Sequence, residues 1–299
     1  MKRPEWSLVQ YRVDDSEKLS VGVSVGGSVV PGPPGTEGLS LMEVLGRWDS
    51  LAPLLREWVP AASDVIVAEA RLAPPLTYPG KVLCAGANYW DHCAEMGVEP
   101  PDELGDPFFF LKPPTTTVTG PGDSVPLPSY PGARIDWEAE LAVVIGRTGR
   151  NLSPEQALDH VAGYLAANDI SARDRLTAPK PVGKPFAYDW VGHKGQDGFC
   201  PLGPGVVPAW LVPDPQNLRI RLSVNGVVKQ DSSTAQMMVP IHEVVAAASR
   251  LTRLEPGDVI LTGTPAGVGA ARGEFLTAGD EVVVEIERIG RLENPVVAS

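Results

Sequence analysis

Glycine and proline interrupt this chain so often that little room is left for long helices. The 299 residues include 31 glycines and 31 prolines. Because both residue types favour turns and disfavour helix interiors, the chain favours many short strands over a helical bundle. Segments 7–13, 81–89 and 135–146 have the apolar or alternating pattern of strands. We therefore expect a strand-rich α+β protein.

Helical signals are confined to a few segments. They fall at 39–59, 90–97, 153–169 and 241–251. The third opens with Ser153 as a cap and Pro154 at the first helical position. Asn225-Gly226 predicts a β-hairpin. Strands and helices do not alternate regularly, which argues against a doubly wound or TIM-type fold.

A proline-rich segment ending near Gly80 predicts a domain boundary. Before it, strand patterns and one helical pattern form a small unit. After it, strand patterns dominate to the end. We expect a small N-terminal domain over residues 1–78 and a larger, strand-rich domain over 79–299.

The charge of the chain excludes some partners. The formal net charge is −12, and no block of Lys or Arg interrupts the acidic character. Such a chain is a poor binder of nucleic acid or of an anionic membrane. An anionic substrate would need local cations to overcome the overall negative field.

Cysteine usage and the N-terminal sequence bear on the compartment. Cys84, Cys93 and Cys200 are scattered and form neither a disulfide framework nor a CxxC zinc pattern, so a reducing compartment is expected. No signal-peptide pattern follows the basic N-terminus, and no apolar run approaches the ~20 residues of a membrane span. We expect a cytoplasmic protein without a membrane partner.

The segment IDWEAELAVVIG, residues 135–146, places acids on a face that becomes apolar. In a strand, Asp136, Glu138 and Glu140 share that face with Ala142 and Val144. One interpretation is a solvated strand end. The other is a site for a divalent cation, because adjacent carboxylates repel each other unless a cation lies between them. Asp169 ends another apolar segment and is the candidate third ligand.

Three further features each permit two interpretations. Arg173 either pairs with Asp169 or Asp174, or binds a substrate carboxylate in a bidentate fork. His92 and Glu95 are three residues apart, as in an exposed surface pair or in a general base with its orienting acid. The segment TGTPAGVG, 262–269, lacks the Lys-Ser/Thr of a phosphate loop. It is either a flexible turn or a nest in which backbone N–H groups and Thr264 hold a substrate carboxylate.

In combination, these segments resemble the fumarylacetoacetate hydrolase family. The motifs that carry the resemblance are CAGANYWDHCAEMG, FFFLKP, DWEAELAVVIGR, AGYLAANDISARD and LEPGDVILTGTPAGVG, in the family order across most of residues 80–292. The resemblance implies a mixed β-roll catalytic domain, a small N-terminal α/β domain and usually a homodimer. It also implies Mg²⁺ or Mn²⁺ as cofactor. The residues it implies are Glu138, Glu140 and Asp169 for the metal, His92, Glu95 and Lys194 for catalysis, and Arg173, Lys194 and Thr264 for the substrate.

The resemblance implies an enzyme acting on a small anionic 2-oxo acid. The first expectation is hydrolysis of a C–C bond in a 2,4-diketo acid through a metal-stabilised enolate, with water activated by His92 and Glu95. The alternative is an isomerase or decarboxylase, of the 2-hydroxyhepta-2,4-diene-1,7-dioate isomerase or oxaloacetate decarboxylase type. A third hypothesis is a metal-binding scaffold that does not catalyse a reaction. Leu176, where many members have Gln, and the unusual segment 175–196 leave the substrate open.

Overall fold

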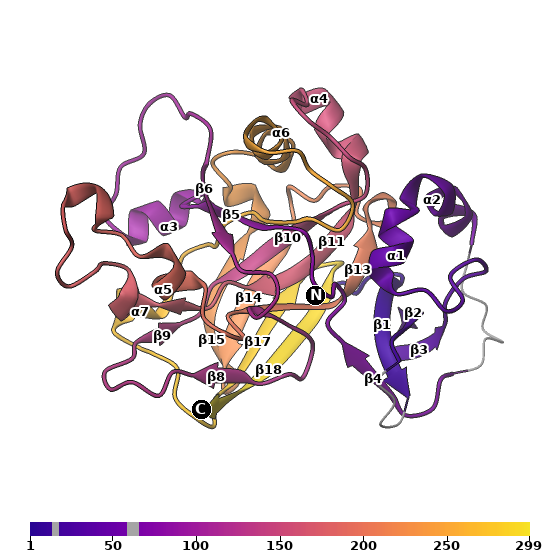
Figure 1. The fold of residues 1–299 in the computed structure, drawn as a ribbon, viewed down its shortest axis with the longest axis horizontal. Coiled ribbons are helices and arrows are strands. Elements are labelled where there is room, and N and C mark those ends of the chain that lie inside the picture. The colour runs from indigo at the N-terminus through magenta and orange to yellow at the C-terminus, as the bar shows by residue number, and fades with distance from the viewer. Residues whose placement is uncertain (14–17, 59–65) are drawn as a thin grey trace.

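The structure is a computed structural model that describes residues 1–13, 18–58 and 66–299 (Figure 1). It confirms a strand-rich α+β fold built mainly from two sheets. The larger sheet has eleven strands. They are β1 (Ser7–Val13), β2 (Ser20–Val25), β3 (Ser28–Pro31), β4 (Ala70–Ala73), β5 (Val82–Gly86), β6 (Phe108–Lys112), β7 (Val118–Thr119), β10 (Ala139–Ile145), β11 (Val161–Asn168), β13 (Cys200–Pro208) and β16 (Val259–Leu261).

The second sheet packs against the centre of the first (Figure 1). Its five strands are β8 (Val125–Leu127), β14 (Arg219–Val224), β15 (Val227–Ser233), β17 (Glu281–Ile286) and β18 (Gly290–Ala298). The expected hairpin is confirmed, since Asn225 and Gly226 connect β14 to β15 with φ angles of 51° and 76°. A two-stranded ladder joins β9 (Ile135–Asp136) to β12 (Ser171–Ala172).

The helices are short and lie around the sheets. They are α1 (Leu41–Gly46), α2 (Trp48–Glu57), α3 (Trp90–Glu95), α4 (Pro154–Ala157), α5 (Trp190–Lys194), α6 (Ile241–Leu251) and α7 (Gly269–Arg272). Short 3-10 turns supplement them, including η2 (Arg173–Arg175) and η3 (Lys184–Phe186). Within the described parts of the chain, no helix combines the length and the apolar character that crossing a bilayer requires.

The alternation predicted for the acidic strand is present, but both of its faces are buried. Leu141 and Val143 of β10 point into a core shared with α6 and the second sheet. Ala142 and Val144 point into a second core, on the side of α1 and α2. Because β11 and β16 pair with β10 on its two edges, the strand is enclosed in every direction. The interpretation of this segment as a solvated strand end is therefore wrong.

The helix expected over 153–169 is correct only in its first turn. Ser153 caps α4, which ends at Ala157, and residues 161–168 form strand β11. All eight residues of β11 are buried between β10 and β13, which explains the continuous apolar run. A strand that is buried on both faces lacks the alternation by which strands are usually recognised.

The N-terminal unit shares a sheet and a core with the rest of the chain. Strand β1 pairs with β13 at Leu8 and Val206. Leu8, Leu41 and Trp48 lie in the same apolar cluster as Ala142. The boundary expected after residue 78 remains a prediction, and the N-terminal residues form one wall of the core behind β10.

Candidate active site

Three carboxylates meet where β10 and β11 lie side by side. Glu138 directly precedes β10, Glu140 lies within it, and Asp169 follows the last residue of β11. The antiparallel register places residue 168 opposite Ala139, so the three acids come to one end of the strand pair. One ligand atom from each acid lies within 4.8 Å of the others, and all three side chains are buried. The predicted metal ligands are therefore brought together.

The electrostatics of this triad suit a divalent cation. Burial, with Asp169 and Glu138 nearby, raises the pKa of Glu140 well above its usual value. Basic side chains contact Glu138 and Asp169, so Glu140 is the carboxylate of the three whose negative charge a bound cation would favour most. Carboxylate oxygens converging in this way are the donor set that Mg²⁺ and Mn²⁺ prefer. The residues present fit such an ion.

Two lysines contact Asp169. Lys194, at the end of α5, lies 2.8 Å from its Oδ2 and 2.7 Å from Oε2 of Glu138. Burial disfavours its charge, but Asp169 and Glu138 keep the pKa of Lys194 above its ordinary value. Lys112, on β6, lies 2.6 Å from Oδ1 of Asp169 and is fully buried. Lys194 was predicted for the site, whereas Lys112 was not.

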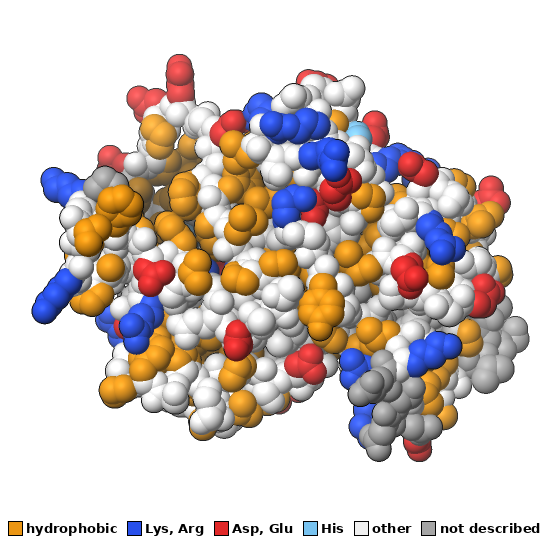
Figure 2. Space-filling model, in the orientation of Figure 1, with side chains coloured by type: hydrophobic (Ala, Val, Ile, Leu, Met, Phe, Trp, Pro, Cys, Tyr) orange, Lys and Arg blue, Asp and Glu red, His pale blue; other side chains and the backbone are white. Residues whose placement is uncertain are grey.

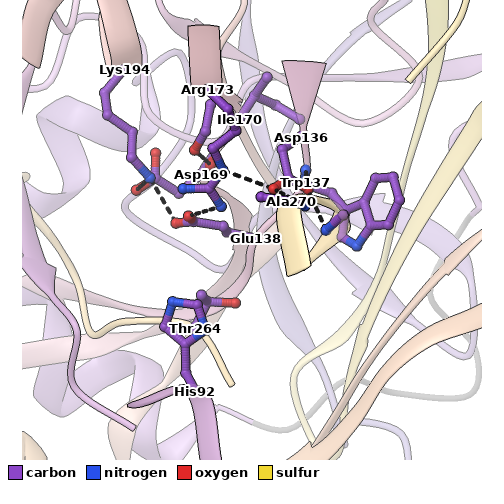
Figure 3. Close-up of polar contacts among 12 residues, drawn as sticks. His92, Asp136, Trp137, Glu138, Asp169, Ile170, Arg173, Lys194, Thr264 and Ala270 are labelled. Carbon is purple, nitrogen blue, oxygen red and sulfur yellow. Dashed lines mark hydrogen bonds and ion pairs between the residues drawn. The ribbon is translucent and has the colours of Figure 1, made fainter. Parts of the chain in front are cut away.

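Arg173 has partners that the sequence did not indicate. Its Nε donates to Asp136 at 2.7 Å, and its Nη2 donates to Glu138 at 2.6 Å (Figure 3). Both interpretations that paired it with Asp169 or Asp174 are wrong, since η2 follows a strand ladder and does not continue a helix. The first acid of the acidic segment, Asp136, thus fixes the guanidinium at the site.

His92 and Glu95 form the expected pair. Nδ1 of His92 lies 3.3 Å from Oε2 of Glu95 on the short helix α3. His92 is only 7% exposed, so the interpretation as an exposed surface pair is wrong. In the view of Figure 3 the imidazole lies on the opposite side of Glu138 from Lys194 and Arg173. A carboxylate that accepts from Nδ1 leaves Nε2 free to act as a base.

The glycine-rich loop after β16 holds the acids of the site. Its backbone N–H groups donate to three different carboxylates: Gly263 to Glu140 at 2.6 Å, Gly267 to Glu95 at 2.9 Å, and Gly269 and Ala270 to Asp136 at 2.6 and 2.9 Å. A Cβ at Gly267, where φ is +109°, would lie 2.2 Å from the carbonyl oxygen of Lys229. The loop is therefore a fixed frame, and the flexible-turn interpretation is wrong.

Thr264 lies in this loop with a partner that the sequence did not indicate. Gln230 of β15, which is fully buried, donates its amide to the Thr264 hydroxyl oxygen and to the Pro265 carbonyl, both at 2.8 Å. Its own carbonyl accepts from Ala139 at the start of β10. The Thr264 hydroxyl keeps its proton available, as a contact with a substrate carboxylate would require.

The unusual segment 175–196 ends in an aromatic cluster that holds α5. Trp190 stacks on Phe110 of β6 at 5.0 Å between ring centroids and packs against Phe108 at 5.1 Å with the rings tilted by 40°. Trp190 and Lys194 are four residues apart on one helical turn, so this packing fixes the base of the lysine side chain. Figure 2 shows apolar side chains gathered over the outer part of this segment, where Val182 and Phe186 are exposed.

Comparison with known proteins identifies the family. Residues 81–297 match the model described as Fumarylacetoacetate (FAA) hydrolase C-terminal. The chain belongs to the fumarylacetoacetate hydrolase family. A member of the family from Xenopus laevis, the mitochondrial oxaloacetate tautomerase, is 39% identical over 97% of this chain and 90% of its own. The match extends through the N-terminal unit.

Solved structures extend the range of activities in the fumarylacetoacetate hydrolase family. The 2-hydroxyhepta-2,4-diene-1,7-dioate isomerase of Mycobacterium marinum has a TM-score of 0.71 and 32% identity, with 98% of both chains covered. The maleylpyruvate hydrolase of Sphingobium sp. SYK-6, in complex with manganese(II) ion and pyruvate, has a TM-score of 0.75 and 28% identity, with 98% of this chain and 99% of that chain covered. The relatives are enzymes, and they favour the isomerase alternative at least as well as the hydrolase expectation.

Proposed function

We propose that this protein is a divalent-metal-dependent tautomerase that interconverts the keto and enol forms of a 2-oxo dicarboxylic acid such as oxaloacetate. The observation that carries the proposal is the His92 imidazole, which Glu95 holds and which points toward Glu138 of the buried carboxylate triad (Figure 3). It is supported by the name of the relative that matches nearly the whole chain. Tautomerisation thus replaces C–C hydrolysis as the preferred hypothesis for the reaction.

The metal site would be formed by Glu138, Glu140 and Asp169. A Mg²⁺ or Mn²⁺ ion bound there would polarise the keto oxygen of the substrate and favour the charge that develops on it. The three ligands lie in or next to one pair of hydrogen-bonded strands, β10 and β11, so the site does not need to be assembled on binding.

His92 would move the proton. With Nδ1–H directed at Glu95, Nε2 takes a proton from C3 of the keto acid, the C–H electron pair forms the C2–C3 double bond, and the π pair of the C2 carbonyl moves to O2. O2 then accepts the proton that Nε2 took, which gives the enol and returns the imidazole to its neutral form. The reverse steps return the keto form. Glu95 holds the tautomer and the orientation of the ring, since its other oxygen is fixed by the Gly267 N–H.

The basic residues would bind the two carboxylates of the substrate. Arg173 uses Nε and Nη2 for Asp136 and Glu138, which leaves other N–H groups of the guanidinium for an anion. Lys194 and the Thr264 hydroxyl are the other candidates. Leu176 places an apolar side chain where many family members have Gln, so this chain would bind one end of the substrate with fewer polar contacts.

The test measures loss of the enol absorbance of oxaloacetate with Mn²⁺, using wild type and His92→Asn. We expect a fast metal-dependent reaction in the wild type and a loss of ~10²–10⁴-fold in kcat for the variant, as for removal of a general base. Absence of acceleration in the wild type would overturn the proposal. Formation of two fragments from an acylpyruvate at a higher kcat/KM would instead support C–C hydrolysis, the activity of the maleylpyruvate hydrolase neighbour.

The assembly and compartment are also proposals. The family resemblance supports a homodimer, and three free buried cysteines support a reducing compartment such as the cytoplasm. Light scattering after gel filtration would give the mass in solution, and a monomer at micromolar concentration would contradict the dimer.

A further inference from the structure

This inference concerns how the proposed metal site binds its ion, and it rests on the proposed function. Every carboxylate oxygen of Glu138 and Asp169 already contacts a basic side chain. On Glu138, Oε1 accepts from Arg173 and Oε2 from Lys194. On Asp169, Oδ1 lies beside Lys112 and Oδ2 accepts from Lys194. A metal ion that binds these two acids therefore competes with at least one of three cations.

Lys112 is held independently of the acids. Its Nζ donates to the backbone carbonyls of Ile170 at 3.0 Å, Lys194 at 2.6 Å and Phe199 at 2.7 Å. Those three oxygens come from separate segments around the site, and the side chain is fully buried. Moving this ammonium would leave three buried carbonyls without a donor, which is costly. Lys112 is a permanent part of the site.

Arg173 is likewise held from outside the triad. Asp136 accepts from its Nε and is itself fixed by the N–H groups of Trp137, Gly269 and Ala270. The guanidinium can give up one contact with Glu138 and still keep a buried carboxylate partner. The guanidinium therefore stays in position when a metal ion binds, because its contact with Asp136 is unaffected.

Lys194 differs from both. Within the ranges that the structure describes, its ammonium donates only to Glu138 and Asp169, two of the three proposed metal ligands. It bridges an oxygen of each, as Figure 3 shows, and the Phe110 ring 5.4 Å away is its other neighbour. A flexible four-carbon stem connects it to the end of α5, so the ammonium can leave while the helix stays in place.

We propose that Lys194 is the exchangeable counter-ion of the metal site: a divalent cation and the Lys194 ammonium compete for the same oxygens of Glu138 and Asp169, and metal binding frees Lys194 for the substrate. The two positive charges cannot share those lone pairs at bonding distance without strong repulsion. The face of Phe110 offers the displaced ammonium a favourable neighbour. The metal ion would thus bind before the substrate, and the Lys194 ammonium that it displaces would be available to bind a substrate carboxylate.

The test is calorimetric titration of Mg²⁺ into wild type, Lys194→Met and Lys112→Met. Because a competitor lowers apparent affinity by the fraction of sites it occupies, we expect Lys194→Met to bind Mg²⁺ at least ~10-fold more tightly than the wild type. Lys112→Met, which removes an equal charge 2.6 Å from Asp169 against 2.8 Å for Lys194, should bind no more tightly. Equal tightening in both variants would show a general charge effect and overturn the exchange, as would unchanged affinity in Lys194→Met.

A crystal structure of the wild type with Mn²⁺ and no substrate tests the exchange without any variant, in case a substitution prevents folding. We expect the Lys194 ammonium to lie beyond hydrogen-bond distance of at least one of the two oxygens it now bridges. An ammonium still bonded to both, with the ion in place, overturns the inference. A wild type that binds neither Mg²⁺ nor Mn²⁺ overturns the proposed metal site itself, which separates the two failures.

Discussion

Replacing Asp136 with Asn should destabilise the protein by about as much as breaking a buried ion pair. The two oxygens of Asp136 accept four hydrogen bonds: Oδ1 from the N–H groups of Trp137 at 2.8 Å and Gly269 at 2.6 Å, Oδ2 from Ala270 at 2.9 Å and from Arg173 Nε at 2.7 Å. An amide keeps one oxygen and places an NH₂ group at the other position. Two of the four donors then face a donor.

The magnitude follows from these contacts. A hydrogen bond to a charged group contributes ~1.5–3 kcal/mol, so two lost bonds cost ~3–6 kcal/mol. The lower part of that range applies because the Arg173 side chain is 18% exposed and can turn toward water. We expect the free energy of unfolding to fall by ~3–4 kcal/mol, which for a chain of 299 residues lowers Tm by roughly 5–6 °C.

Urea unfolding followed by circular dichroism measures this loss, with Asp231→Asn as a matched control. Asp231 also pairs with an arginine, Arg219, but the two side chains are 40% and 54% exposed. Such a surface pair contributes less than ~1 kcal/mol. If Asp136→Asn loses no more than the control, Asp136 does not anchor Arg173 and the glycine-rich loop in the way described. KM for the dicarboxylate should also rise, because Arg173 loses the carboxylate that holds its guanidinium in position.

Three further predictions concern the site and its surroundings. Glu140→Gln should weaken Mg²⁺ binding at least ~100-fold by calorimetry, because losing a ligand costs more than losing an outer partner, and unchanged affinity would remove Glu140 from the metal site. Glu95→Gln should lower kcat ~10–10³-fold while leaving Mg²⁺ affinity unchanged, because the base loses its orienting charge; a change in affinity alone would contradict the assigned role. Burial and Lys194 lower the pKa of His193 to about 4. His193 is therefore neutral in the folded state, and its contribution of ~3 kcal/mol to stability is present above pH 6.5 and lost as the pH falls toward 4. Urea unfolding at a series of pH values should show that His193→Asn loses less stability over that interval than the wild type. Equal dependence of the free energy of unfolding on pH in the two proteins would refute this prediction.

Much of the local structure could be predicted from the sequence. The strand at 7–13, the helix at 241–251 and the Asn225-Gly226 hairpin follow from periodicity and turn chemistry within a few residues. The error at 153–169 has a physical cause. A central strand is apolar on both faces, and only the neighbours β10 and β13 distinguish it from a buried helix.

The candidate site could likewise be predicted from the sequence only in part. The motifs identified the eight candidate residues, and the structure brings them together around Glu138 and the glycine-rich loop. Lys112, Gln230 and the anchoring role of Asp136 were missed. Lys112 lies on the inward face of β6 in FFFLKP, and an isolated lysine within an apolar strand was the available signal.

The amino-acid sequence by itself determined which residue types were present for this chemistry: oxygen ligands on a strand, an imidazole with a carboxylate one helical turn away, and a loop rich in glycine. Only the tertiary structure decided which charges contact each other. The acids lie on β10 and after β11, and their cations come from β6, η2 and α5. Since contacts between distant segments depend on the folded backbone, no local pattern shows that Asp136 holds Arg173 or that Lys194 bridges two metal ligands.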